Sequence, residues 1–159
     1  MIAIILFFFF AVPFPYRTLE NREKLIVSVN DKTLPAGCAL VSSPEYLFVG
    51  DDIEFSVSAS DTVALFVFTE TQYANFNNTG SYTFNEKQLL DVINGKLGYH
   101  VSSVETYYFV VYNRQTGFLG IDAKSVDIYS VSIKEFWQEE ITKYITLWEM
   151  LTGTQPHQL

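Results

Sequence analysis

Two runs of apolar and β-branched residues dominate the hydrophobic pattern of the chain. Residues 106–113 have the sequence TYYFVVYN, and residues 62–69 have the sequence TVALFVFT. Both runs lack glycine and proline and are short for a helix, so each predicts a strand that is buried on both faces. We expect the two strands to be neighbours in one sheet or to face each other across a core. Side-chain alternation in the first run places Phe109 and Val111 in the core and Val110 on the opposite side.

Other segments have the pattern of strands with one face in water. Residues 53–59 alternate strictly between apolar and polar side chains. Residues 124–133 alternate as well, but the parity changes between Ile128 and Val131, which indicates a bulge or a bend. A further short strand is expected at 25–29.

Two short segments have helical signals. Thr69 and Gln72 match a capping box at the start of a helix over 70–76, which the following Asn- and Gly-rich residues should end. Residues 86–93 carry apolar side chains at helical spacing and predict one or two helical turns. The Asn-Gly dipeptide at 94–95 then predicts a turn.

The pattern changes in the C-terminal part, where a long helix is expected over 134–152. Ser132 and Glu135 match a second capping box, and Gly153 occupies the position of a C-terminal cap. Apolar residues recur at helical spacing and would form one stripe, whose principal members are Trp137, Ile141, Tyr144, Ile145 and Trp148. The stripe would pack on the protein's own domain, dock on a partner subunit or lie at a membrane interface.

The charges near this stripe favour a protein partner over a membrane surface. Four carboxylates lie close to it, at Glu135, Glu139, Glu140 and Glu149. They outnumber the two nearby cations, Lys134 and Lys143, which alone would attract anionic lipids.

The first residues, 1–16, have the sequence MIAIILFFFFAVPFPY and carry no charged side chain. They favour a membrane anchor, a strand inserted into a neighbouring subunit, or a cleavable signal. A helix that spans a membrane needs about 20 residues, and this run is shorter. Two prolines also interrupt it. The residues expected to contact a membrane or another subunit are Ile2, Ile4, Ile5, Leu6, Phe7, Phe8, Phe9 and Phe10.

Each interpretation places the remaining chain at the cell surface or on the extracytoplasmic face of a membrane. The cations Arg17, Arg22 and Lys24 follow the apolar run and would favour the opposite orientation. The orientation therefore stays open.

The fold class expected from these elements is mainly β, an antiparallel β-sandwich of jelly-roll or Ig-like layout with an N-terminal apolar segment and one C-terminal amphipathic helix. The expected organisation is an apolar anchor or inserted segment at 1–16, a linker at 17–24, the β-sandwich domain at 25–133, the helix at 134–152 and a polar tail at 153–159.

Composition and motifs exclude several classes of function. The net charge of −8 opposes binding to nucleic acid. Cys38 is the only cysteine, so the chain cannot form an internal disulfide, and no zinc-binding spacing is present. Phosphate-loop, HExxH, CxxC and GxSxG motifs are missing from the sequence. We therefore expect no enzymatic activity, catalytic residue, cofactor or metal site.

Asn77 begins an N-x-T sequon and would be glycosylated if the protein is exported.

The order of strand 62–69, short helix 70–76, Asn- and Gly-rich loop, strand 106–113 and strand 126–133 resembles the small β-sandwich domains of archaeal secreted and membrane-anchored proteins. Those domains are similar in layout to GOLD-type domains. The resemblance covers about residues 49–133 and implies a binding or structural module without catalytic residues.

The expected function is that of a structural and interaction subunit in an extracytoplasmic membrane-bound or filamentous assembly. Its partners would be other protein subunits, in a homo-oligomer or a membrane complex, with a membrane contact through residues 1–16. One alternative is an extracellular module that binds a carbohydrate or a peptide through loops 70–85 and 113–121, with a pocket lined by Tyr73, Phe76, Tyr82 or Phe118. A further alternative is an accessory subunit of a membrane enzyme complex.

Overall fold

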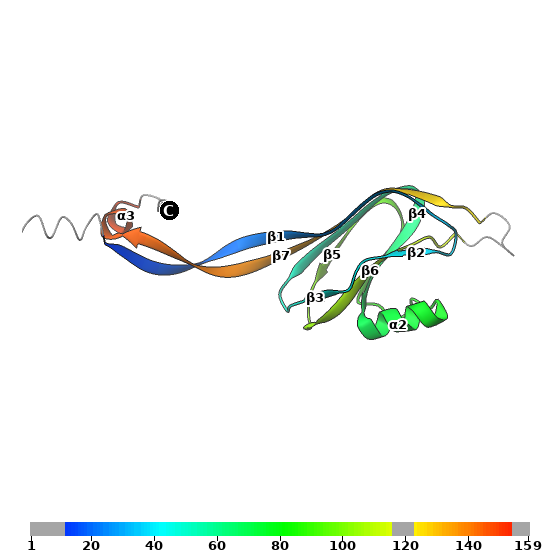
Figure 1. Ribbon diagram of the computed structural model, residues 1–159, viewed down its shortest axis with the longest axis horizontal. Coiled ribbons are helices and arrows are strands. Elements are labelled where there is room, and N and C mark those ends of the chain that lie inside the picture. The colour runs from blue at the N-terminus through cyan, green and yellow to red at the C-terminus, as the bar shows by residue number, and fades with distance from the viewer. Residues whose placement is uncertain (1–11, 116–122, 154–159) are drawn as a thin grey trace, which may run out of the picture. The chain divides into compact units, whose positions relative to one another are not determined.

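The computed structural model describes residues 12–115 and 123–153 (Figure 1). The chain divides into two compact units. The first unit comprises residues 1–22 and 138–159, and the second comprises residues 23–137. Strands β1 (Pro13–Leu34) and β7 (Val126–Thr146) contribute residues to both units.

The second unit is built on one antiparallel sheet, which confirms the mainly β fold class. Its other elements are β2 (Ala39–Val41), β3 (Glu45–Leu47), β4 (Asp52–Thr69), α2 (Glu70–Thr79), β5 (Lys87–His100) and β6 (Glu105–Tyr112). The strand order is β1-β7-β4-β6-β2, while β3 also pairs with β6 and β5 also pairs with β4. The sheet is nearly closed, like a barrel.

Strand β4 is the centre of the sheet. Its first half pairs with β5 and β7, so that Phe55 lies opposite Leu97 on one side and Ile133 on the other. Its second half pairs with β5 and β6, and Val67 lies opposite Phe109. The two runs that the sequence marks as core strands are therefore sheet neighbours, as predicted.

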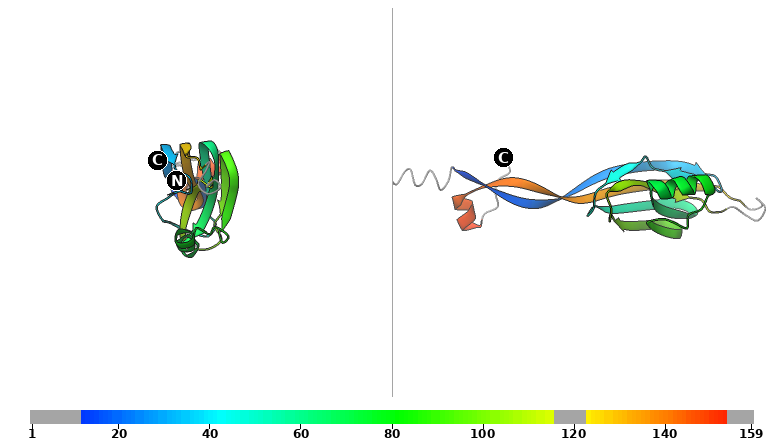
Figure 2. Two further views of the ribbon diagram at one scale, coloured as in Figure 1. Left: turned by 90° about the vertical axis from the view of Figure 1, so that its right-hand side faces the viewer. Right: turned by 90° about the horizontal axis from the view of Figure 1, so that it is seen from below.

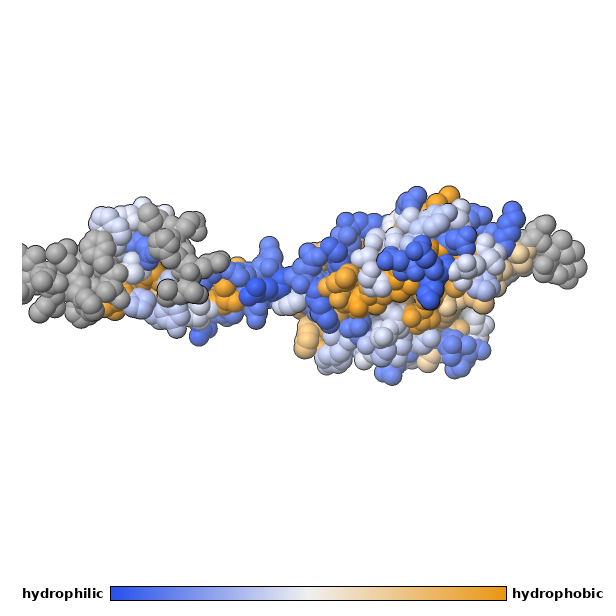
Figure 3. Space-filling model, turned by 45° about the horizontal axis from the view of Figure 1, so that its top comes forward, coloured by the Kyte–Doolittle hydropathy of each residue, from blue (hydrophilic) through white to orange (hydrophobic). Residues whose placement is uncertain are grey.

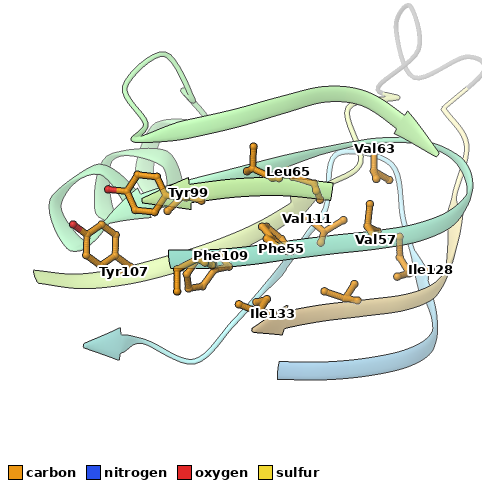
Figure 4. Close-up of a cluster of buried hydrophobic side chains, with 14 of the residues drawn as sticks. Phe55, Val57, Val63, Leu65, Tyr99, Tyr107, Phe109, Val111, Ile128 and Ile133 are labelled. Atoms are coloured by element: carbon orange, nitrogen blue, oxygen red, sulfur yellow. The ribbon is translucent and has the colours of Figure 1, made fainter. Parts of the chain in front are cut away.

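The inner face of the sheet holds the larger core cluster (Figure 4). Phe109 and Val111 point into this core and Val110 packs on the opposite face, which confirms the predicted alternation. The predicted bulge in β7 is also present. Its register with β4 steps from Ser130 to Ile128, so that Tyr129 is the extra residue and lies exposed.

Helix α2 covers the outer face of β4 and β6 (Figure 2). The side chain of Thr69 accepts a hydrogen bond from the backbone N–H of Gln72, and the Gln72 side chain accepts one from the N–H of Thr69. Gly80 ends the helix in the left-handed conformation, with φ of 71°. The predicted helix and its capping box are thus confirmed, and the helix continues to Thr79.

We expect the Thr69→Ala substitution to lower the free energy of unfolding by about 1 kcal/mol, because an N–H of the first turn loses its acceptor. Chemical denaturation followed by circular dichroism measures this change. Thr71→Ala is the matched control, since Thr71 is exposed within the same helix and alanine favours helix formation. Equal stability of the Thr69→Ala variant and the wild type would contradict a stabilising role for the cap.

The helical turns predicted for residues 86–93 and the turn at 94–95 are wrong, because residues 87–95 belong to β5. Leu89 pairs with Leu65 and packs against the inner core, whereas Leu90 packs against the outer cluster beneath α2. A strand that is apolar on both faces buries two adjacent leucines, which a short amphipathic helix would place on one side. Asn94 pairs with Ser58 in the ladder and accepts a hydrogen bond from its hydroxyl.

The helix predicted for 134–152 is wrong over most of its length. Strand β7 continues to Thr146, and only Leu147–Thr152 form a helix, α3. Residues 134–136 pair with β4, and cross-strand contacts with β1 follow. These long-range pairings override the helical spacing, and the β-branched and aromatic side chains of the segment suit a strand.

The linker predicted for 17–24 is also wrong, since these residues lie within β1 together with the short strand expected at 25–29. This part of β1 is largely exposed and therefore lacks the alternation of a half-buried strand. Its mixed charges, which suggested a linker, form ion pairs with β7. Examples are Glu23 with Lys134 at 2.6 Å and Lys24 with Glu135 at 3.7 Å.

Candidate docking surface

The described part of the first unit consists of a two-stranded ribbon and a short helix. The ribbon comprises residues 13–22 of β1 and 138–146 of β7, and α3 follows it. None of the residues that the structure describes in this unit is buried. An isolated two-stranded ribbon is marginally stable in water at best.

Ion pairs connect the two strands of the ribbon. Arg17 contacts Glu140 at 3.1 Å, and Arg22 contacts Glu139 at 2.8 Å. Lys143 donates a hydrogen bond to the carboxylate of a third residue, Glu20.

This last bond holds the pKa of Glu20 below its ordinary value and raises the pKa of Lys143 above its own. Each charged side chain of the ribbon thus has a partner of opposite sign. All of these pairs are substantially exposed, so they contribute to the register of the two strands more than to stability.

The ion pairs also show which side chains share a face of the ribbon. Glu20 and Lys143 lie on one face of the ribbon. Because side chains of a strand alternate between its two faces, Ile141 and Ile145 lie on the same face as Lys143. Arg17 and Glu140 lie on the other face, together with Tyr144.

The single apolar stripe expected from the sequence is therefore divided. Ile141 and Ile145 share one face, Tyr144 lies on the other, Trp148 belongs to α3, and Trp137 belongs to the second unit. The division follows from the two-residue period of a strand, which replaces the helical period on which the stripe was predicted.

One end of the ribbon is apolar and exposed. Large apolar side chains of this end that face solvent are Phe14, Tyr144, Trp148, Met150 and Leu151. Figure 3 shows hydrophobic and hydrophilic residues side by side on the described surface of this unit. Exposed apolar side chains gathered in this way are typical of a docking surface.

Helix α3 begins with a capping box of its own. The carboxylate of Glu149 accepts hydrogen bonds from the N–H of Thr146 at 2.7 Å and from its hydroxyl at 2.8 Å. Gly153 ends the helix in the left-handed conformation, so the predicted C-terminal cap is confirmed although the helix is much shorter.

The remaining predicted contact residues, Ile2, Ile4, Ile5, Leu6, Phe7, Phe8, Phe9 and Phe10, lie outside the described residues. Among the residues that the structure describes, no helix is long and apolar enough to cross a membrane. The sequon residue Asn77 is exposed in the last turn of α2.

Three of the four aromatic side chains proposed to line a ligand pocket instead pack together. Tyr73 stacks on Tyr108 with ring centroids 4.2 Å apart, and Phe76 is buried. The ring of Tyr82 lies 5.1 Å from that of Phe66. The fourth residue, Phe118, lies outside the described residues. The packed side chains cover the outer face of the sheet, where Tyr73 and Tyr82 remain partly exposed.

Two carboxyl groups of the second unit are buried, those of Asp51 and Glu135. Asp51 accepts a hydrogen bond from the N–H of Phe48 at 2.7 Å and so stabilises the β3–β4 turn. Burial raises the pKa of Glu135, and a hydrogen bond with Asp51 raises it further. The positive charge of Lys24 acts in the opposite direction and lowers this pKa.

Within the described ranges, no group of three or more His, Cys, Asp or Glu residues could hold a metal ion.

No protein-family model matches the chain, and no curated protein matches it. The docking surface is therefore interpreted from its own geometry and chemistry.

Proposed function

We propose that the chain is a structural and interaction subunit of an extracytoplasmic assembly that is membrane-bound or filamentous. The observation that carries the proposal is the two-stranded ribbon, which has exposed apolar side chains and no buried residue in its described part. Such a ribbon gains stability by packing against other protein chains or against lipid. The protein has no enzymatic role in this proposal.

The prolines of β1 favour packing through the faces of the ribbon over pairing along its edge. Strand β1 lies at the edge of the sheet and includes Pro13 and Pro15. Proline lacks a backbone N–H, so an added strand would lose hydrogen bonds at both positions. Partner subunits therefore contact the side chains of the ribbon, among them Ile141 and Ile145.

The uncharged residues 1–16 support a location at the cell surface or on the extracytoplasmic face of a membrane. The antiparallel sheet and its covering helix agree with a GOLD-like binding or structural domain of the kind found in archaeal secreted proteins. We propose a sandwich of this layout for residues 25–133, with the ribbon as the part that joins subunits.

Replacing both Ile141 and Ile145 with threonine should weaken self-association by about tenfold or more. Threonine keeps the β-branched shape that suits a strand but removes apolar contact area, and each buried isoleucine is worth about 1.5–3 kcal/mol. Sedimentation velocity of the full-length protein in mild detergent measures the association.

The matched control is Ile93→Thr, since Ile93 is also an isoleucine in a strand that is not buried, but it belongs to the second unit. This variant should associate like the wild type. A monomeric wild-type protein, or unchanged association of the double variant, would contradict the proposed function.

A further inference from the structure

The apolar end of the ribbon, defined here as residues 12–16 and 144–151, has almost no charge. Its only ionisable carboxylate or ammonium group is on Glu149, whose carboxylate is engaged in the cap of α3. Its aromatic side chains include Tyr16, Tyr144 and Trp148, and the last two are about half exposed. Met150 and Leu151 are more exposed still.

Charged residues begin directly beyond this end. Arg17 and Lys143 are the first charges on the two strands, and the ion pairs with Glu140 and Glu20 follow. Along the two strands, an apolar segment thus gives way to Tyr16 and Tyr144 and then to basic and acidic side chains, while Trp148 lies in the adjoining helix. Membrane proteins show this order at the boundary between hydrocarbon and water, where tryptophan and tyrosine are enriched and cations adjoin the headgroups.

The structure removes the charge argument that favoured a protein partner over a membrane. Glu135 is buried and belongs to the second unit. Glu139 and Glu140 are each paired with an arginine, and Glu149 is engaged in the helix cap. The charges of Glu139 and Glu140 are therefore compensated by arginine, so these two carboxylates add little to the repulsion of a lipid surface.

The residues that precede the apolar end in the sequence are also apolar. Residues 1–11 have no charged side chain and consist almost entirely of aliphatic residues and phenylalanine. We propose that the apolar end of the ribbon and α3 lie in the interface of a lipid bilayer, with Trp148 and Tyr144 at the level of the headgroups. The inference rests on the membrane-bound form of the proposed function and adds residues 144–151 to its membrane contact.

The test uses the fact that Trp137 and Trp148 are the two tryptophans of the chain. Trp137→Phe leaves Trp148 as the single fluorophore, and Trp148→Phe leaves Trp137, which belongs to the second unit. Each full-length variant is reconstituted into phosphatidylcholine vesicles, with or without bromine atoms on the acyl chains near the headgroups. Bromine quenches only fluorophores that approach it closely. We expect severalfold stronger quenching of Trp148 than of Trp137, in variants whose circular dichroism matches the wild type.

Absence of Trp148 quenching in protein that floats with the vesicles would overturn the inference, and so would equal quenching of both tryptophans. If bromine does not quench Trp148 but a soluble quencher cannot reach it in the oligomer, a protein partner covers the apolar end instead. Sedimentation of the Ile141→Thr, Ile145→Thr variant is an independent readout. Quenching of Trp148 with unchanged association would leave the membrane contact in place and reject the assembly role of the ribbon faces.

Discussion

Replacing Phe109 with alanine should lower the free energy of unfolding by about 3–5 kcal/mol. The Phe109 side chain is 1% exposed and lies edge-to-face against Phe55, with ring centroids 5.7 Å apart. It belongs to a core that receives side chains from several strands, so the cavity left by alanine cannot close without moving the sheet. Urea denaturation followed by circular dichroism measures the loss.

The matched control is Phe84→Ala, because the Phe84 side chain is 68% exposed in the same unit. Its effect should stay within about 0.5 kcal/mol. A loss below about 1 kcal/mol for Phe109→Ala would show that the side chain is not part of a close-packed core.

Asn113→Ala should cost about 3 kcal/mol, because each buried polar group left without a partner costs about 1–3 kcal/mol. The Asn113 side chain is fully buried and donates hydrogen bonds to the carbonyl oxygens of Leu34, at 3.0 Å, and Lys124, at 2.8 Å. Its own oxygen accepts a bond from the N–H of Gln115 at 3.0 Å. The residue thereby joins the end of β1, the end of β6 and the segment before β7.

The control for this position is Asn94→Ala. The Asn94 side chain also makes a hydrogen bond, to Ser58 at 2.7 Å, but it does so at the surface, where water can replace it. Denaturation curves of the two variants should differ clearly in midpoint. If Asn113→Ala is as stable as Asn94→Ala, the three bonds of Asn113 do not hold these segments together.

The docking surface illustrates how far sequence reasoning reaches. The residue types of the candidate surface were identifiable, because residues 1–16 have no charged side chain and aromatic and aliphatic side chains recur in residues 137–151. Their arrangement was not. A helix would have put Ile141, Tyr144 and Ile145 on one face, whereas the strand separates Tyr144 from the two isoleucines.

The buried polar residues were missed for a related reason. Glu135 and Asn113 have no local signal that marks them as buried, since burial depends on partners that lie far away in the chain. Glu135 is covered within the sheet beside Lys24, and Asn113 bonds to Leu34. Both partners belong to β1. The mixed charges of residues 17–24 predicted a linker instead of this strand, so its pairing was not expected.

By itself, the sequence determined the features that depend on neighbours within a few positions. These are the alternation of β4 and β6, the bulge after Ile128, and the capping box of Thr69 and Gln72. Only the tertiary structure decided whether residues 134–146 would form a helix or a strand. Their side chains suit both periods. Residues 134–136 pair with β4, and the residues that follow contact β1, so the segment forms a strand. The contacts with β1 join residues more than a hundred positions apart and the pairs with β4 join residues at least 80 positions apart, so no local pattern can encode them.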